Sequence, residues 1–390
     1  MNNIVLKAGR EASVYRMHHW IFSGAIHGKT DHLKEGELIK ILSSKNETLG
    51  FGHYSNSSIS VRIIQFGGES LATDFWETII HKAYNFRQYL GLTSCNVTNA
   101  YRLVHGEGDG LPGLIIDVYN LHAVIQCHTI GMYNHLEEIA HALHQVYKNQ
   151  LKTIYNKSKE SLGNSVSLEN KFLHGNLEET IIRENGNLFK VNWVTGQKTG
   201  FFVDQRENRN LLAQYCSGKS VLNLFCYSGG FSVYAGMNKA SKIYSVDVSA
   251  KAIDLANENM LLNKIASAIY SNSTSDVSHF LSPSESYDII ICDPPAFAKS
   301  MNKRHQAVNG YKNLNAKVIK KVKPGGLLFT FSCSQVMDRE LFQQTILAAA
   351  LESKRTVKII HHLSQAPDHP INIYHPEGSY LKGLVLYIED

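Results

Sequence analysis

The stretch VLNLFCYSGGF, residues 221–231, decides the fold of this chain. A short apolar run ends in a turn that contains Gly229 and Gly230, and the residues that follow, FSVYAGM, read as the start of a helix. Doubly wound α/β folds bind nucleotides at such strand–turn–helix junctions. Four further apolar runs alternate with helical stretches, which predicts a parallel sheet with helices on both faces: KIYSVDV, ASAIY, YDIIICD and GLLFTFS.

The remaining patterns divide the chain into three predicted domains. The last two apolar runs, TVKIIHHL and LKGLVLYIE, are expected to add an antiparallel hairpin, which makes residues 186–390 a seven-stranded α/β domain. Residues 1–72 contain short alternating runs such as ISVRIIQF, which favour a small β-barrel or sandwich. Residues 73–185 combine strand-like runs with helical patterns near 75–90 and 132–147, and the polar stretch 156–176 is predicted to be a surface loop.

The composition is that of an ordinary globular protein, with 43% hydrophobic and 19% charged residues among 390. A net charge of +5 fits RNA or another polyanion without deciding between them. The N-terminus lacks the apolar core of a secretory leader, and the six cysteines form no C-x-x-C pair, so we expect a cytoplasmic protein without membrane association. The 19 histidines form no H-E-x-x-H motif and no cluster with cysteine, so no metal site is expected.

The glycine turn favours S-adenosylmethionine over a dinucleotide as the cofactor. A dinucleotide fold needs G-x-G-x-x-G to seat a pyrophosphate, but the turn holds only Gly229 and Gly230, and Gly236 comes too late. Asp247 ends the next apolar run, where its carboxylate is placed to accept hydrogen bonds from both ribose hydroxyls. Asp276, after the third run, is a candidate for the adenine amino group. The alternatives are a plain left-handed turn for the glycines and helix N-caps for the two aspartates.

Two neighbouring runs end in residues that suggest nucleobase chemistry. In IIICDPPAF, two prolines stiffen the turn after Asp293, and FTFSCS places Cys333 at the end of the next strand, facing the same crevice. The C5 atom of cytosine is a poor nucleophile, but thiolate attack at C6 makes it able to attack a sulfonium methyl group. Asp293 is then a candidate to hydrogen-bond the N3/N4 edge of the base. A buried structural role is the alternative for Cys333 and the favoured interpretation for Cys292 and Cys226.

With these motifs marked, the chain resembles the family of PUA-domain-containing class I methyltransferases, whose best-known member makes 5-methylcytosine in large-subunit ribosomal RNA. The resemblance covers nearly the whole length and implies a PUA barrel that helps to hold RNA, an α+β middle domain and a Rossmann-like methyltransferase domain with Cys333 as the nucleophile. The chain departs from the family at His19, where proline is common, at Ala296, where lysine is usual, and at Ser278, where an aromatic residue often follows the adenine-binding acid. The matching segments follow one another in the family's order: LKAGREASVYRMHHWIFSGAI, YRLVHGEGDGLPGLIIDVY, ENGNLFKVNWVTGQKTGFFVDQRENR, VLNLFCYSGGFS, ICDPPAF, FSCS and YLKGLVL.

The resemblance also implies the residues of both sites. Cofactor contacts are expected at Gln205, Arg206, Asn223, Phe225, Tyr227, Ser228, Gly229, Asp247, Asp276 and Asp293. Substrate contacts are expected at Pro294, Pro295, Phe297, Lys299 and Trp20. Lys299, Lys303 and Arg304 are also candidates for contact with the RNA backbone, and Arg10, Arg16 and Trp20 are softer candidates. Solvated surface charge is the alternative for Arg206, Lys299, Lys303 and Arg304, and core packing is the alternative for Trp20. The expected partner is large-subunit ribosomal RNA, and a homodimer is one expected assembly.

Four functions stay open on the sequence. The first is C5 methylation of a cytosine in RNA, and the second is methylation of a ring or exocyclic nitrogen, for example in guanine. Related enzymes of the second kind lack a cysteine at the fifth strand end, so Cys333 distinguishes the two. The third is a non-catalytic RNA-binding or assembly factor on the same fold, and the fourth is a dehydrogenase, which the glycine spacing disfavours.

Overall fold

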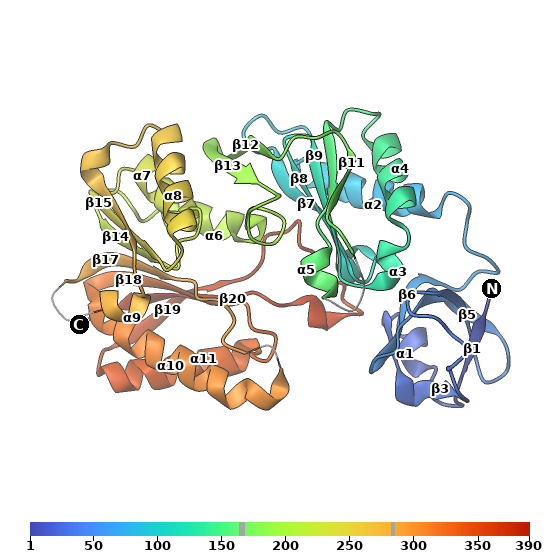
Figure 1. Ribbon diagram of the computed structural model, residues 1–390. Coiled ribbons are helices and arrows are strands. Elements are labelled where there is room, and N and C mark those ends of the chain that lie inside the picture. Colours follow the sequence, from blue (N-terminus) through green and yellow to red (C-terminus); the bar gives the residue numbers. More distant parts are fainter. Residues whose placement is uncertain (164–167, 282–284, 299) are drawn as a thin grey trace. The chain divides into compact units, whose positions relative to one another are not determined.

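The computed structural model describes residues 1–163, 168–281, 285–298 and 300–390, which form two compact units (Figure 1). Unit 1 consists of Met1–Ile182, Val191–Val203 and Pro367–Gly378, and unit 2 consists of Arg183–Lys190, Asp204–Ala366 and Ser379–Asp390. The chain therefore returns to unit 1 near its C-terminus before it completes unit 2. The expected division at residues 72 and 185 into three domains stays a prediction.

The N-terminal part of unit 1 is a six-stranded sheet in the order β2-β6-β5-β4-β1-β3. The alternating run over Ile59–Phe66 is strand β6, and buried aliphatic side chains such as Ile39, Ile41 and Val61 form one core inside the sheet. Its elements are β1 (Asn3–Leu6), α1 (Ala12–Tyr15), β2 (Trp20–Phe22), β3 (Ile26–His27), β4 (Leu38–Leu42), β5 (Thr48–Tyr54) and β6 (Ile59–Phe66).

The rest of unit 1 is built on a five-stranded sheet in the order β11-β10-β9-β8-β7. The helix expected over 132–147 is two helices, α3 and α4, which are separated at Asn134 and His135. The elements are α2 (Phe75–Tyr89), β7 (Ala100–His105), β8 (Leu114–Tyr119), β9 (His122–Cys127), α3 (Ile130–Tyr133), α4 (Leu136–Val146), β10 (Thr153–Asn156), α5 (Lys159–Leu162) and β11 (Lys171–His174).

The returning segment Pro367–Gly378 is fastened to this part of unit 1 by hydrogen bonds of Asp368. The Asp368 carboxylate accepts a hydrogen bond from the amide of Arg102 at 2.9 Å, and its carbonyl accepts one from Nη2 of Arg87 at 2.7 Å. Arg87 and Asp368 are both fully buried, and Arg87 also forms a bidentate ion pair with Asp109. Buried charged groups need such partners, so unit 1 lacks part of its interior without this segment.

Unit 2 contains a seven-stranded sheet in the order β16-β15-β14-β17-β18-β20-β19, in which β20 alone runs antiparallel to its neighbours. The predicted methyltransferase-like α/β fold and its antiparallel final hairpin are thus confirmed. In β17 the side chains of Ile289–Cys292 are all buried, as expected for a parallel strand covered on both faces. The strands are β14 (Ser220–Leu224), β15 (Lys242–Asp247), β16 (Tyr270–Thr274), β17 (Tyr287–Cys292), β18 (Val322–Ser332), β19 (Val357–Leu363) and β20 (Lys382–Ile388).

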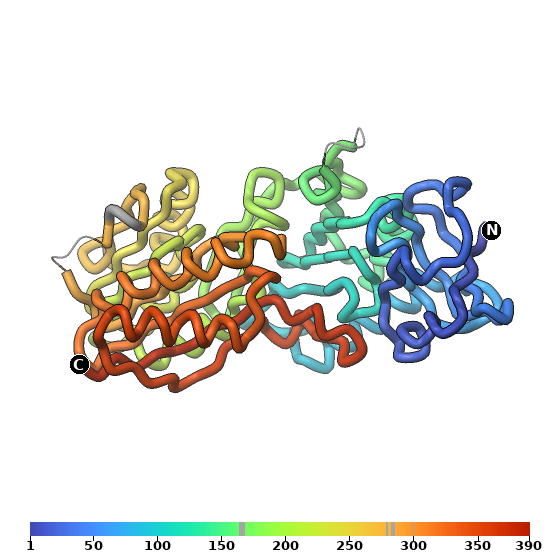
Figure 2. Tube along the Cα trace, turned by 90° about the horizontal axis from the view of Figure 1, so that it is seen from below, coloured from blue at the N-terminus to red at the C-terminus, as the bar shows by residue number. Residues whose placement is uncertain are grey.

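Helices cover both faces of this sheet, with α7 and α8 on one side and α10 and α11 on the other (Figure 1). Figure 2 shows α10 and α11 lying side by side. Among the helices of the described ranges, none combines the length and the hydropathy needed to span a bilayer. The helices of unit 2 are α6 (Arg206–Ala213), α7 (Gly230–Met237), α8 (Ala250–Leu262), α9 (Val277–Phe280), α10 (Arg304–Lys321) and α11 (Arg339–Ser353). The chain passes from unit 1 to unit 2 within strand β12 (Glu179–Glu184) and back within strand β13 (Asn187–Asn192), and the two strands pair as a hairpin.

Two further predicted elements that differ from the structure lie at sheet edges. The run ASAIY was expected to be a strand, but Ser267–Ile269 form a short 3₁₀ turn, and β16 follows with the polar sequence YSNST. The stretch 156–176 was expected to be a loop, but it contains the edge strand β11. Edge strands are only half covered, so their sequences lack the apolar pattern on which the predictions rested.

Candidate active site

The register of the sheet brings the ends of the central strands into one row. Leu224 of β14 pairs with Val246 of β15 and with Cys292 of β17, and Cys292 pairs with Thr330 of β18. The residues that follow these positions therefore meet at the carboxyl edge of the sheet. The strand order reverses at β14 and β17, and open α/β sheets bind their ligands at such a switch point.

The loop after β14 is a tight turn with three left-handed residues. Phe225, Tyr227 and Gly229 have φ values of 59°, 46° and 73°, so two residues with side chains take a conformation that favours glycine. Gly229 lies against α8, where a Cβ would be 3.0 Å from Cβ of Ala256. Gly229 thus lacks a Cβ at a place where helix α8 packs against the turn. This agrees with the alternative from the sequence, in which the glycines form a plain left-handed turn.

Two polar residues of the first strand and turn are buried against α7 and α8. Asn223 donates to the hydroxyl of Ser232 at 2.9 Å, and the carbonyl of Ser228 accepts a hydrogen bond from Asn259 at 2.8 Å. Both hydrogen bonds join the strand and turn to neighbouring helices of the protein. The structure therefore places these two expected cofactor residues in the support of the turn.

Asp247 at the end of β15 is tied to the glycine turn. Its Oδ2 accepts a hydrogen bond from the amide of Tyr227 at 3.0 Å, and its Oδ1 accepts one from the amide of Ser249 at 2.9 Å. The N-cap of α8 is Ser249, whose hydroxyl accepts from the amide of Ala252, so Asp247 is not the helix cap that the sequence left open. A carboxylate has about four acceptor positions, which leaves about two on Asp247 for a ligand.

Asp276 follows the end of β16 beside Asp247. The amide of Ser275 donates to the carbonyl of Asp247 at 2.9 Å, which holds the start of α9 at this edge of the sheet. Asp276 is exposed and lies directly before the short helix Val277–Phe280. The position suits either of its two expected roles.

Asp293 at the end of β17 is held by an amide chain. Nε2 of Gln205 donates to Oδ2 of Asp293 at 2.8 Å, and Asn208 donates to Oε1 of Gln205 at 2.6 Å. Gln205 and Asn208 are buried, and Asn208 also donates to the carbonyl of Ser364 at 3.1 Å. This chain fixes the direction of the Asp293 carboxylate, so Gln205 contacts the predicted catalytic acid.

Cys333 lies in the loop after β18, and this loop is joined to the D-P-P-A-F loop. The hydroxyl of Ser334 donates to the carbonyl of Ala298 at 2.7 Å. Cys333 and Cys95 are the two partly exposed cysteines, whereas Cys226 and Cys292 are buried as expected. Burial raises the pKa of both buried thiols. Cys333 is thus accessible at the strand end.

Lys382 at the start of β20 faces the same loop from the other side. Its ammonium donates to the carbonyls of Ser334 at 2.8 Å and Tyr380 at 2.6 Å, and the side chain is almost fully buried. Burial lowers the pKa of Lys382 to about 8, although the negative charge available on Cys333 acts in the opposite direction. The structure therefore places a buried cation close to the predicted nucleophile.

Two aromatic rings complete the wall beside Cys333 and Asp293. Burial, together with the charges on Cys333 and Asp293, raises the pKa of Tyr311 in α10. Phe297 packs edge-on against Tyr311 with ring centroids 4.6 Å apart, and 39% of Phe297 remains exposed. Phe297 thus presents an apolar surface beside the two polar groups.

The other expected site residues differ in how far they are exposed to solvent. Arg206 is buried and pairs with Glu207 at 3.0 Å, which argues against free surface charge. Pro294 is buried and Pro295 is exposed in the loop after Asp293. Lys299 lies outside the described residues.

The basic and aromatic candidates for RNA contact are also unevenly placed. Arg304 forms an exposed ion pair with Asp338, whereas Arg10, Arg16 and Lys303 are exposed. Trp20 is partly buried, and its indole donates to Glu107 at 2.8 Å. This is the packing alternative for Trp20 rather than an open stacking platform.

Sequence reasoning missed Lys382 and Tyr311. Lys382 is the first residue of the apolar run KGLVLYI. A lysine next to a buried strand could have been predicted to be buried and paired, because lysine is rarely buried without a partner. Tyr311 carried no such signal, because its position depends on how α10 packs on the sheet.

Comparisons with known proteins agree with this architecture. Residues 165–381 match the family model of S-adenosylmethionine-dependent methyltransferases, and residues 4–66 match that of PUA-like domains. The chain is 39% identical to a protein of Pseudoalteromonas atlantica named ribosomal RNA large subunit methyltransferase I, with 98% of each chain covered.

Two solved structures share the fold over the full length. One is a Streptococcus mutans protein assigned as a SAM-dependent methyltransferase, with a TM-score of 0.85, 24% identity, and 99% and 100% of the two chains covered. The other is an assigned methyltransferase solved with SAH, with a TM-score of 0.87 and the same identity and coverage.

Proposed function

Because the chain belongs to the S-adenosylmethionine-dependent methyltransferase family and carries a PUA-like domain, we propose that it methylates C5 of a cytosine in large-subunit ribosomal RNA. The observation that carries this proposal is the placement of Cys333 beside Asp293 at the carboxyl edge of the sheet. The full-length relative named as a large-subunit ribosomal RNA methyltransferase supports the choice of RNA. The proposal makes Cys333 the nucleophile and Asp293 the group that recognises the base.

The residues at the switch point fit the methyl donor. Asp247 keeps acceptor positions for two ribose hydroxyls, since each of its oxygens accepts only one hydrogen bond from the protein backbone. Asp276 offers a second carboxylate on the neighbouring strand end, where an adenine amino group would be held. When bound, S-adenosylmethionine supplies an electrophilic methyl group at this edge of the sheet.

The protein groups then act on the cytosine in a defined order. The thiolate of Cys333 adds to C6, and the electron density gained by the ring makes C5 nucleophilic toward the methyl group. The carboxylate of Asp293, held by Gln205, is oriented to accept a hydrogen bond from the N4 amino group. Formation of the bond from C5 to the methyl carbon breaks the bond of that carbon to the donor's sulfur. A base then removes the C5 proton, and the Cys333 thiolate leaves as the ring regains its aromaticity.

Lys382 supports this chemistry as a positioning residue. Its hydrogen bonds to the carbonyls of Ser334 and Tyr380 hold the ammonium beneath the loop that carries Cys333. A nearby positive charge favours the thiolate over the thiol, and the thiolate is the nucleophile. Because the pKa of Lys382 is about 8, the ammonium is charged at neutral pH.

The proposal is tested by trapping the covalent intermediate. An RNA in which the target cytosine carries fluorine at C5 cannot lose a proton there, so the Cys333 adduct should accumulate and migrate as a protein–RNA complex on a denaturing gel. Cys333→Ser should form no adduct and have no turnover, while it binds S-adenosylmethionine with wild-type affinity in calorimetry. The matched control is Cys95→Ser, because Cys95 is the other partly exposed cysteine.

The target is found by mass mapping of modified bases in ribosomal RNA from cells that lack the protein. Loss of one 5-methylcytosine is the expected result. Loss of a methylated guanine, or full activity of Cys333→Ser, would contradict the covalent mechanism. An unchanged modification map together with a failure to bind S-adenosylmethionine would instead favour a non-catalytic RNA-binding role.

A further inference from the structure

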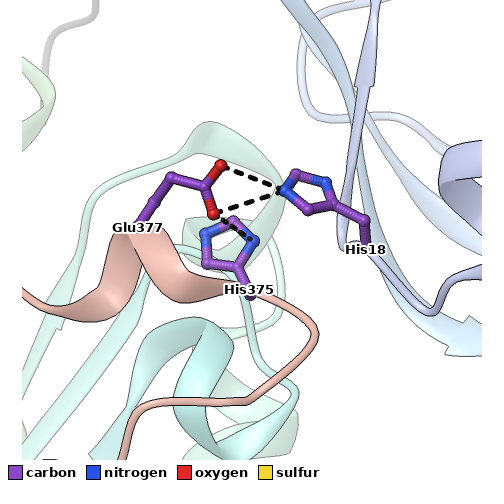
Figure 3. Close-up of side chains that lie close together, drawn as sticks. All are labelled: His18, His375 and Glu377. Atoms are coloured by element: carbon purple, nitrogen blue, oxygen red, sulfur yellow. Dashed lines mark hydrogen bonds and ion pairs between the residues drawn. The ribbon is translucent and has the colours of Figure 1, made fainter.

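A cluster of metal-ligating side chains lies in unit 1, whereas the residues of the methyltransferase site belong to unit 2. His18 precedes β2 in the N-terminal sheet, and His375 and Glu377 lie on the returning segment Pro367–Gly378. Figure 3 shows the two imidazoles and the carboxylate converging on a common point. One nitrogen of each histidine and one carboxylate oxygen all lie within 4.8 Å of one another.

We propose that His18, His375 and Glu377 form a binding site for a divalent transition-metal ion of the zinc class. The proposal does not depend on the methyltransferase chemistry. It assigns the ion a structural role, which is to fasten the segment Pro367–Gly378 to the N-terminal sheet. Two imidazoles and one carboxylate are a ligand set that suits zinc, and a fourth position remains open.

The distances from Glu377 to the two histidines are close to those of a tetrahedral site. With metal–ligand bonds of about 2.0–2.2 Å, neighbouring ligand atoms of a tetrahedron lie about 3.3–3.6 Å apart. Nε2 of His18 lies 3.3 Å and 3.4 Å from the two oxygens of Glu377, and Nδ1 of His375 lies 3.7 Å from Oε2. These distances are long for hydrogen bonds to a carboxylate. The two distances from His18 match the edge of such a tetrahedron, and the distance from His375 is slightly longer.

The state of His375 is an independent sign of a missing ligand. The His375 side chain is 1% exposed, and its Nδ1 is buried without a hydrogen-bond partner in the structure. A buried polar atom without a partner costs free energy, and a bound cation would remove that cost.

The backbone of Trp20 fixes the ring of His18. Nδ1 of His18 accepts a hydrogen bond from the amide of Trp20 at 3.2 Å and lies 3.4 Å from the carbonyl of the same residue, while Nε2 faces Glu377. The neighbouring His19 has both nitrogens engaged, with Ile63 at 2.8 Å and with Asn372 at 3.4 Å, so it does not compete for the ion. A cavity of about 300 Å³ beside His18 is also lined by Ser13, Arg16 and Tyr374.

The experiment uses the full chain after treatment with a chelator and exchange into metal-free buffer. Titration with Zn²⁺ in a calorimeter should show one tight site at a ratio of 1:1. Glu377→Gln and His375→Gln should each weaken that site by at least about tenfold to a hundredfold, because even the loss of an outer-shell partner costs that much. The control is His135→Gln, since His135 pairs with Glu138 at 3.2 Å without a third ligand.

A second measurement needs no variant. Co²⁺ added to the metal-free chain should give the intense visible absorption of a tetrahedral centre, and Zn²⁺ should displace it. Binding of Zn²⁺ that is equally tight in wild type, Glu377→Gln and His375→Gln, or a Co²⁺ spectrum of the octahedral aqueous ion, would overturn the proposal. In either case the methylation assay is unaffected, so the two proposals fail separately.

Discussion

Replacing Arg209 by Met should destabilise unit 2 strongly, because it breaks a buried ion pair behind the glycine turn. Nε and Nη2 of Arg209 lie 2.7 Å from the two oxygens of Glu184, and the side chains are 3% and 0% exposed. The same arginine supports α7, since a Cβ at Gly230 would lie 3.1 Å from Cδ of Arg209. Removing one partner leaves the Glu184 carboxylate buried with only uncharged donors such as Tyr234.

The expected loss is about 3–5 kcal/mol in the free energy of unfolding, the usual cost of removing one partner from a buried pair. The double variant Glu184→Gln/Arg209→Met should recover most of that loss, because no uncompensated charge remains. The matched control is Arg304→Met, which breaks the pair with Asp338 at exposures of 40% and 64% and should cost less than about 1 kcal/mol.

The assay must report on unit 2 alone. The three tryptophans, Trp20, Trp76 and Trp193, all belong to unit 1, so their fluorescence is the wrong signal. Hydrogen–deuterium exchange with mass spectrometry along a urea series, read on peptides from β14 and α7, measures the opening of unit 2 directly. The reasoning is refuted if Arg209→Met lies within about 1 kcal/mol of wild type, or if the double variant is less stable than Arg209→Met.

Three further predictions concern the methyltransferase site. Lys382→Met should slow alkylation of Cys333 by iodoacetamide about 3- to 10-fold at pH 7, because the nearby charge favours the thiolate. This difference should vanish as the pH rises through about 8, where Lys382 loses its charge, and Lys323→Met is the control. Asp247→Asn should weaken S-adenosylmethionine binding at least about tenfold in calorimetry, since each lost charge-assisted hydrogen bond costs about 1.5–3 kcal/mol. The control variant Asp254→Asn changes an exposed aspartate and should bind S-adenosylmethionine with wild-type affinity. Gln205→Glu places a second carboxylate beside Asp293, so turnover should fall at pH 8 and partly recover at pH 6, where one proton is shared; equal loss at both values, or the same loss in Gln214→Glu, would contradict this.

Local patterns predicted the parts of the fold and site that depend on neighbours in the sequence. The buried strand over Ile289–Cys292, the turn at Gly229 and the acid at Asp247 follow from hydropathy and glycine spacing, and the parallel register then places their ends together. Contacts between distant segments left no local signal. His18 and Glu377 are 359 residues apart, so the metal cluster was outside what motif spacing can detect, and the absence of a metal motif said nothing about it.

The same limit explains the role of Lys382. Its place beside Cys333 depends on the antiparallel pairing of β20 with β18, in which Ser332 lies opposite Lys382. The hairpin could be predicted from the two final apolar runs, but its register could not, because register is set by packing across the sheet.

The late return of the chain to unit 1 has a consequence for biosynthesis. A ribosome extends the chain from its N-terminus, and domains that are continuous in sequence fold as they emerge. Here the buried guanidinium of Arg87 must wait for the backbone of Asp368, which is translated 281 residues later. The first unit therefore remains incomplete until residue 368 has been made, and a nascent chain stalled before residue 367 should be cleaved by protease around Arg87 and Arg102, where the released protein is resistant.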